Sequence, residues 1–152
     1  MRLGLLAMGL TGLLAAACGA APTGIDGDWK LVEGTLGGEQ ILTETRRPGD
    51  MRPGSRDATL VIQGNEVSGQ GPCNMYGGSL EVNAREGSGF APSEFAAEWG
   101  DVFATLATCG DSVDAIEDVY FEALLQTDRG RRDRDIMILR GDEARLVFEL
   151  DQ

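Results

Sequence analysis

The chain carries three cysteines, and the surroundings of the first indicate its chemistry most directly. Cys18 ends a segment in which Arg2 precedes an apolar run from Leu3 to Ala17. A cationic start, a short apolar stretch and small residues before a cysteine are typical of exported bacterial lipoproteins, whose cysteine thiol accepts a diacylglycerol. We therefore expect residues 1–17 to be a lipoprotein signal peptide and Cys18 to be the lipidated residue.

Two other fates of this segment are plain cleavage with release of a soluble protein, which Ala15 favours, and retention as an uncleaved membrane stub. The apolar run is shorter than the roughly 18 residues that a helix needs to cross a bilayer. Residues 18–25 are expected to form a short tether, and Gly19 favours the outer membrane, with the domain facing the periplasm.

Cys73 and Cys109 remain as an even pair in an oxidising compartment, so we expect them to form a disulfide. A redox-active pair is the alternative. The sequence has no Cys-x-x-Cys spacing, however, and no neighbouring base that would lower a thiol pKa. These observations favour a structural bridge.

Histidine is absent from the chain, which removes the usual general base and the commonest metal ligand. No phosphate loop, dinucleotide fingerprint or calcium-loop spacing is found, and Lys30 on a predicted strand is a poor substitute base. The formal net charge of −12 would repel a phosphate backbone. We expect no catalytic residue, no cofactor, no metal and no nucleic-acid partner.

The elements that must position the cysteines are mostly strands, because apolar and polar residues alternate between short turn clusters rich in glycine. Turns at Gly64-Asn65 and Gly141-Asp142-Glu143 predict two hairpins, and 128–135 is interpreted as an exposed hairpin. The predicted strands are Trp29–Val32, Ala58–Gln63, Glu66–Ser68, Gly77–Val82, Phe103–Thr108, Ile136–Leu139 and Arg145–Leu150.

One helix is predicted from Val113 to Leu125, because apolar residues recur there at steps of three and four. Asp111 or Ser112 would cap its N-terminus. The opposite face is acidic and has no Lys or Arg for an i,i+4 pair, so packing on the sheet must hold the helix. Glu117 is expected to accept hydrogen bonds from backbone amides or to meet an arginine across the sheet.

Two blocks before this helix, Gly69–Gly78 and Ala104–Cys109, resemble those of the META domain family. The family pattern is Gly-Cys-Asn, a turn with Gly, Thr-x-x-Ala-Cys and then Glu-x-x-Phe-x-x-x-Leu. The positions that match it here are Cys73, Asn74, Cys109, Glu117, Tyr120 and Leu124. The resemblance spans about Asp26 to Phe148, with Pro72 and Thr108 as departures and with a longer segment at 84–101.

The resemblance implies a single mainly β (α+β) domain at 26–152. Its fold would be a curved antiparallel sheet or partial barrel of about six to eight strands packed on one helix. The family's activity is poorly defined, with ties to envelope stress and drug tolerance, so the resemblance indicates a fold more than a function.

Three regions could form a ligand or partner surface. Asn74 would either hold a tight turn through its own backbone or present an amide beside Tyr76 at the mouth of a pocket. The arginine loop, 46–56, is either an exposed connection or a contact for anionic lipid headgroups or a phosphate-bearing polymer. Its candidate contact residues are Arg46, Arg47 and Arg52.

The third region is 84–101, which holds Phe90, Phe95 and Trp99. Large apolar rings in a loop rarely all face water, so they would fold back over the sheet, with a short helix from Ser93 to Glu98 capped by Ser93. The alternative is a lid or docking patch for an apolar ligand or a protein.

Together these features favour a non-enzymatic, lipid-anchored envelope protein that binds a protein or an apolar small molecule during envelope stress or maintenance. One alternative is a carboxylate-dependent hydrolase or transferase that uses Glu117. Another is a purely structural envelope protein.

Overall fold

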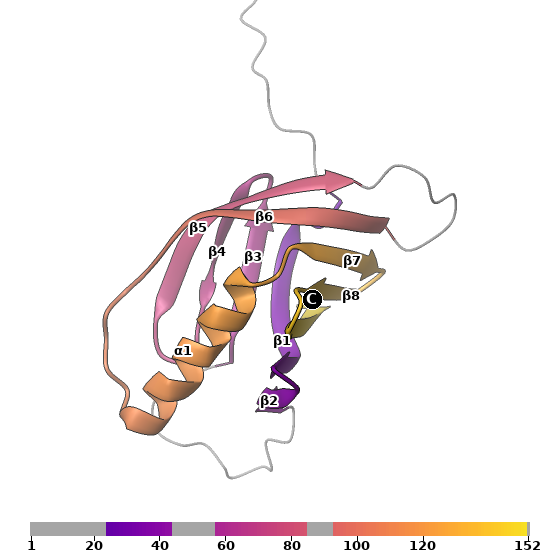
Figure 1. Ribbon diagram of the computed structural model, residues 1–152. Coiled ribbons are helices and arrows are strands. Elements are labelled where there is room, and N and C mark those ends of the chain that lie inside the picture. The colour runs from indigo at the N-terminus through magenta and orange to yellow at the C-terminus, as the bar shows by residue number, and fades with distance from the viewer. Residues whose placement is uncertain (1–23, 44–56, 85–92, 152) are drawn as a thin grey trace, which may run out of the picture.

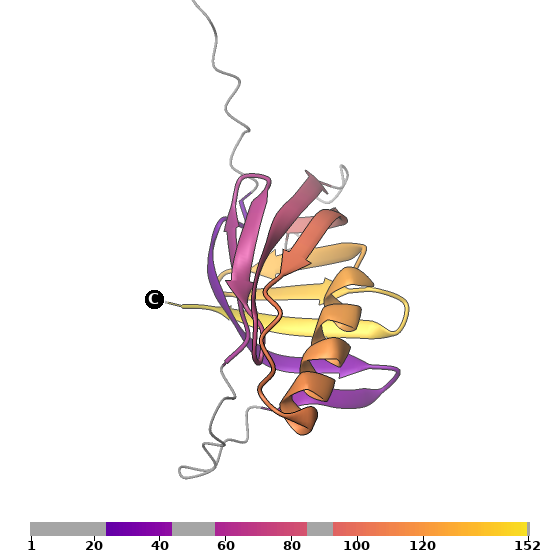
Figure 2. The same ribbon diagram turned by 90° about the vertical axis from the view of Figure 1, so that its left-hand side faces the viewer.

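The computed structural model describes residues 24–43, 57–84 and 93–151. Within these ranges nine strands form one antiparallel sheet with a single helix. The elements are β1 (Gly27–Leu36), β2 (Glu39–Thr43), β3 (Thr59–Gln63), β4 (Glu66–Gln70), β5 (Met75–Ala84), β6 (Ser93–Ala104), α1 (Asp111–Leu125), β7 (Arg129–Asp133), β8 (Ile136–Arg140) and β9 (Ala144–Leu150). Figures 1 and 2 show their arrangement.

The sheet closes into a barrel because β1 has partners on both sides. β1 pairs with β3 along Gly27–Lys30 and with β9 along Trp29–Leu36, so eight strands, β1 and β3 to β9, form a closed ring. β2 is an additional strand that pairs with the second half of β1. The mainly β expectation is confirmed, but the barrel is more closed than a curved sheet or partial barrel. Closure removes exposed sheet edges.

Inward-facing side chains of the barrel and one face of α1 form a common core. Trp29, Leu60, Leu139 and Phe148 are fully buried in it, and α1 contributes Tyr120, Ala123 and Leu124. Figures 1 and 2 show α1 lying against the concave side of the sheet. Ile25 is also buried, so the packed domain begins before β1.

Strand β6 is where the sequence prediction was wrong. Residues 93–98 form a strand that pairs with β5 on one side and β7 on the other, instead of a short helix capped by Ser93. Phe95 and Ala97 point into the core while Glu94 and Glu98 are exposed, which is the period of two that a strand requires. The strand predicted at 103–108 ends at Ala104, and β2 was not predicted.

The helix begins at Asp111, and its N-cap is Gly110 with a φ of 101° and no side-chain cap. Neither Asp111 nor Ser112 caps it, because the chain enters the helix through this left-handed glycine. Among the described residues, no helix has the length and apolar character that a bilayer crossing requires. Residues 1–17, where a signal peptide is expected, and Cys18, Arg46, Arg47, Arg52 and Phe90 lie outside the described residues.

Candidate functional site: the disulfide-anchored connection

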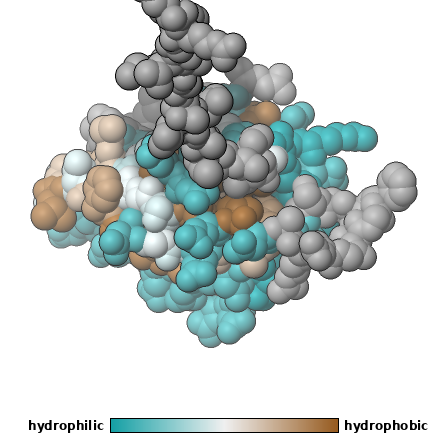
Figure 3. Space-filling model, turned by 90° about the horizontal axis from the view of Figure 1, so that it is seen from above, coloured by the Kyte–Doolittle hydropathy of each residue, from teal (hydrophilic) through white to brown (hydrophobic). Residues whose placement is uncertain are grey.

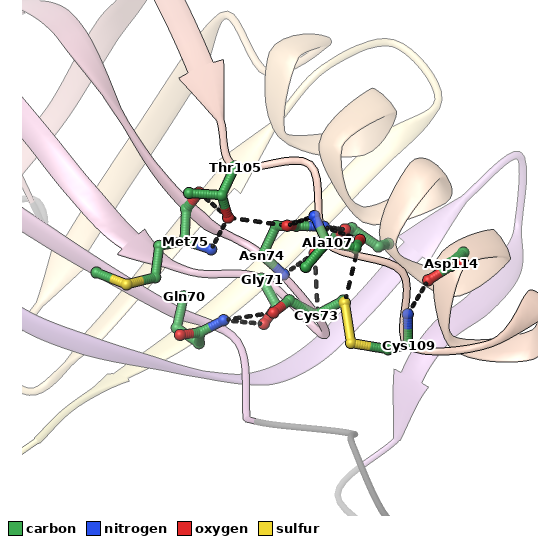
Figure 4. The surroundings of a disulfide bond; sticks show 10 residues. Gln70, Gly71, Cys73, Asn74, Met75, Thr105, Ala107, Cys109 and Asp114 are labelled. Carbon is green, nitrogen blue, oxygen red and sulfur yellow. Dashed lines mark hydrogen bonds between the residues drawn. A yellow bond between two sulfur atoms is a disulfide. The ribbon is translucent and has the colours of Figure 1, made fainter.

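A disulfide joins the turn between β4 and β5 to the start of α1 (Figure 4). Cys73 and Cys109 are 36 positions apart in the sequence, and their Cα atoms are 5.8 Å apart. Cys109 is near the end of 105–110, the segment without regular structure that links β6 to α1 and is called the connecting loop below. The bridge predicted from the cysteine pair is therefore present, and it fixes this loop at its C-terminal end.

Glu117 of α1 holds the β4–β5 turn from the helix side. Its Oε1 accepts hydrogen bonds from the backbone N–H groups of Cys73, at 2.9 Å, and Asn74, at 2.6 Å. Its Oε2 accepts from Asn74 Nδ2 at 2.6 Å. The carboxylate is only 6% exposed, so these three donors replace the water that a buried charge requires. The expectation that Glu117 binds backbone amides is confirmed.

Gly71 allows the turn to approach this carboxylate. A Cβ at position 71 would lie 2.7 Å from Glu117 Oε1, closer than nonbonded atoms can sit, so any side chain would push the carboxylate away. The glycine in the block that precedes Cys73 is thus required by the close approach of Glu117 and not by a positive φ.

The side chain of Asn74 joins the β4–β5 turn to the connecting loop through hydrogen bonds. Its Oδ1 accepts from Thr105 Oγ1 at 2.8 Å and from the Ala107 N–H at 2.7 Å, while its Nδ2 also donates to the Ala107 carbonyl at 3.0 Å. The side chain of Asn74 therefore bonds the connecting loop. The sequence suggested a bond to its own backbone or an amide at the mouth of a pocket, and neither is observed among the described residues. The turn itself is closed by the Gly71 N–H donating to the Asn74 carbonyl at 2.7 Å.

Three large apolar side chains stand out from this rigid framework. Leu106 in the connecting loop is 99% exposed, Phe103 at the end of β6 is 71% exposed, and Met75 at the start of β5 is 62% exposed. We call them the apolar ridge. Phe103 pairs with Gly77 across the β5–β6 ladder, and its ring lies where a side chain at 77 would be. Figure 3 shows hydrophobic residues at the left edge, the side on which Figure 1 places β5 and the connecting loop.

Sequence reasoning missed the ridge. Phe103 and Leu106 fell inside the strand predicted at 103–108, where alternation would have buried part of the set. The signal that could have indicated the ridge is a single large apolar residue, Leu106, that lies between Thr105 and Ala107 and three residues before Cys109.

The ridge borders a negatively charged surface. The connecting loop runs directly into α1, whose first turn contains Asp111 and Asp114 and whose last turn has no basic residue. Asp118 and Glu122 are exposed farther along the helix. The acidic face predicted for the helix is therefore present in part, because Asp118 and Glu122 are exposed whereas Glu117 is buried.

The family model for the META domain matches residues 23–152. The chain belongs to the META domain family. Its fold is also similar to two solved structures. One is an NMR structure of a protein from Burkholderia xenovorans, with a TM-score of 0.59 and 22% identity, covering 94% of this chain and 99% of that one.

The second similar structure is a DUF4847 family protein from Bacteroides vulgatus. It has a TM-score of 0.52 and 13% identity, and the match covers 83% of this chain and 93% of that one. No curated protein matches the chain significantly. At these identities the two matches show a similar fold and carry no information about function.

Tyr76 lies inside the META domain, although the sequence suggested it for a pocket mouth. It is 4% exposed, its hydroxyl donates to the Thr59 carbonyl at 2.7 Å, and the hydroxyl of Tyr120 lies 3.0 Å away. Burial raises the pKa of Tyr76 well above its usual value, and the nearby Tyr120 raises it further. Burial likewise raises the pKa of Tyr120.

These raised pKa values predict that the META domain is destabilised by alkali. A tyrosine in the unfolded chain ionises near about pH 10, whereas the folded pair stays protonated, so the free energy of unfolding should fall as the pH rises above that value. Urea unfolding between neutral and alkaline pH measures the slope, and tyrosinate absorbance reports on this pair alone because the chain has two tyrosines. The slope should be shallower in Tyr120→Phe. Tyrosinate that forms near pH 10 while the protein stays folded would contradict the prediction.

Phe95 and Trp99 belong to strand β6 of the barrel and not to a loop folded back over the sheet, although neither ring is fully exposed to water. Phe95 is in the core. Trp99 is half-buried, and its Nε1 donates to Thr127 Oγ1 at 2.9 Å, just beyond the C-terminal end of α1. Asn74, Tyr76 and Trp99 therefore come from neighbouring elements, but each has a partner inside the protein.

The sulfur atoms of Cys73 and Cys109 and a carboxylate oxygen of Asp114 lie within 4.8 Å of one another. Both sulfurs are used in the disulfide, so neither is a thiolate that could bind a metal. Asp114 Oδ1 accepts a hydrogen bond from the Cys109 N–H at 2.9 Å. This group therefore contributes to the anchoring of the connecting loop.

Proposed function

We propose that this META domain is a non-enzymatic binding module of the cell envelope, anchored to the outer membrane through Cys18 and acting in envelope stress or maintenance. It binds a protein partner, which receives the apolar ridge in an apolar pocket. The observation that carries the proposal is the almost complete exposure of Leu106 on a loop that is held at both ends.

A rigid exposed side chain is a favourable binding element. Ordering a flexible loop on association costs conformational entropy, and a loop that is already fixed avoids most of that cost. Before Leu106, the Thr105 N–H donates to the Met75 carbonyl at 2.9 Å. After Leu106, the bonds between Asn74 and Ala107 and the disulfide at Cys109 hold the chain. The side chain of Leu106 can therefore enter a pocket with little reorganisation of the chain.

The charges around the ridge favour a particular kind of partner. Asp111, which directly follows the connecting loop, and Asp118, farther along α1, are exposed and acidic, so they complement a pocket with Lys or Arg at its rim. The same charges oppose binding of the ridge to anionic lipid headgroups. A protein surface with an apolar centre and a basic rim is the best match.

A non-catalytic role is supported by the environment of Glu117. Both of its carboxylate oxygens accept hydrogen bonds within the protein and the group is buried, which is the environment of a structural anchor. The chain also has no histidine. A carboxylate-dependent hydrolase would need a carboxylate with access to substrate and water.

Photocrosslinking from the connecting loop tests the proposal. A photoreactive residue at Thr108 of the full chain, in cells of the source organism, should give one discrete adduct, whereas the same residue at Asn65, in the exposed turn between β3 and β4, should not. Leu106→Ser should abolish the adduct but change the free energy of unfolding by less than about 0.5 kcal/mol, because the side chain is exposed.

Leu125→Ser is the matched control, since Leu125 is also exposed but lies at the other end of α1. It should leave the adduct unchanged. Identical adducts from Thr108 and Asn65, or an adduct that survives Leu106→Ser, would contradict the proposed ridge contact.

A further inference from the structure

The outer face of β7, β8 and β9 concentrates positive charge in a chain whose formal net charge is −12. Arg129 lies directly opposite Arg140 in the β7–β8 ladder, and Arg140 lies directly opposite Arg145 in the β8–β9 ladder. Like charges at directly opposed positions of a sheet are destabilising. A row of opposed arginines therefore requires counter-charges to offset this repulsion.

The arginines at the two ends of the row have acidic partners. Arg145 forms an ion pair with Glu33. Arg129 pairs with Asp128 at 2.7 Å, and its Nη2 also donates to the Gly141 carbonyl at 3.3 Å.

The central Arg140 differs from these two. Within 24–43, 57–84 and 93–151, the guanidinium group of neither Arg140 nor the neighbouring Arg131 makes a hydrogen bond or an ion pair, and both residues are exposed. Two guanidinium groups on adjacent strands are thus without an ion-pair partner among the described residues.

These free groups line a hollow. Arg129, Arg131 and Arg140 surround a concavity of about 210 Å³, with the buried side chain of Ile138 in its lining. Glu94, which lies opposite Arg131 in the β6–β7 ladder, is the acidic residue of the lining. Because Arg129 is paired with Asp128, two guanidinium groups, those of Arg131 and Arg140, stand against the single carboxylate of Glu94 and leave the hollow positively charged.

We propose that this hollow binds a phosphate group. Guanidinium forks match phosphate geometry, and a tetrahedral anion has enough oxygens to accept from three arginines together, whereas a carboxylate has two. Arg131 and Arg140 supply the free forks, and Arg129 is held in place by Asp128 and Gly141. The site is separate from the apolar ridge: Figure 1 shows β7 and β8 on the right and the connecting loop on the left.

The test uses the full chain with Cys18→Ser, which removes the lipid acceptor, and inorganic phosphate as the probe. Backbone amide signals of β7 and β8 in NMR spectra should shift saturably at constant ionic strength. Arg140→Gln should weaken this response about tenfold or more, because it removes a charged hydrogen-bond donor. Arg134→Gln makes the same charge change in the exposed turn after β7 and should leave the response unchanged.

A second arm separates the sources of the phosphate. The same proteins are sedimented with vesicles of phosphatidylcholine alone and of phosphatidylcholine mixed with phosphatidylglycerol. Saturable shifts with inorganic phosphate assign the site to a free phosphate, whereas Arg140-dependent sedimentation with phosphatidylglycerol alone assigns it to a lipid headgroup. No response in either arm, or equal responses in Arg140→Gln and Arg134→Gln, would overturn the site.

Discussion

Replacing Glu117 with alanine is expected to lower the free energy of unfolding by about 3–5 kcal/mol, a large share of the stability of a small domain. The reason is that the substitution leaves three buried donors without an acceptor: the backbone N–H groups of Cys73 and Asn74, and Asn74 Nδ2. Urea unfolding followed by circular dichroism measures the change.

The Glu117→Gln variant separates the charge from the hydrogen bonds. The glutamine Oε1 can still accept from both backbone N–H groups, but its Nε2 would face the donor Nδ2 of Asn74. We expect a smaller loss than for alanine, about 1–3 kcal/mol. Asn74→Asp should also be strongly destabilising, since it would place a carboxylate oxygen against Glu117 Oε2.

In the double variant Glu117→Gln with Asn74→Asp, the glutamine Nε2 can donate to the aspartate oxygen that replaces Asn74 Nδ2. A donor then faces an acceptor again. The double variant should therefore be more stable than the sum of the two single changes predicts, which a double-mutant cycle measures. Full additivity, or a Glu117→Ala variant as stable as the wild type, would show that this carboxylate does not anchor the turn.

Removal of the disulfide is expected to cost about 4 kcal/mol, the chain-entropy value for a bridge that closes a loop of this length. The paired change Cys73→Ala and Cys109→Ala tests this without leaving a free thiol. The loss should be detected as a lower urea midpoint, and wild-type protein treated with a reductant should approach the same value.

The disulfide also has a local effect that stability alone does not report. Without it the connecting loop is held by Asn74 and by the Asp114 carboxylate on the Cys109 N–H. The Ala107 amide should then exchange with solvent faster relative to core amides such as that of Leu139. Exchange at 107 that is unchanged in the Cys-to-Ala variant would mean that the bridge does not rigidify the loop.

Local signals were sufficient to predict several elements of the fold. The β3–β4 hairpin forms around Gly64, whose φ of 63° favours glycine, and the turn at 141–143 joins β8 and β9 as predicted. The helix was also predicted to within two residues at its start, because its apolar residues follow the helical period.

Other elements depend on contacts that are distant in the sequence. β6 is a strand because it lies between β5 and β7, and its pairing overrides the local helix signal at Ser93–Glu98. Barrel closure depends on β1 meeting β9 at the other end of the chain. A single sequence offers no pattern for such a pairing.

The candidate site was predicted only in part for the same reason. Glu117 and the cysteine pair were identified, because Glu117 matches the helix pattern of the META family by spacing and the even number of remaining cysteines is visible in the sequence. Glu117 was placed on the acidic face of the helix, however, and it is buried. The bonds from Asn74 to Ala107 join residues on separate elements. The rigidity and exposure of Leu106 follow from those bonds and could not be predicted from its neighbours.

The most direct test of the proposal that this is an exported domain with a disulfide-held binding loop is a mass-spectrometric map of its three cysteines. Protein is isolated from membranes of the source organism with free thiols alkylated at lysis, and its peptides are analysed without reduction. We expect an N-terminal peptide that begins with diacylglyceryl Cys18, and the peptides of Cys73 and Cys109 joined to each other. Alkylated Cys73 and Cys109, together with an unprocessed N-terminus, would contradict the account.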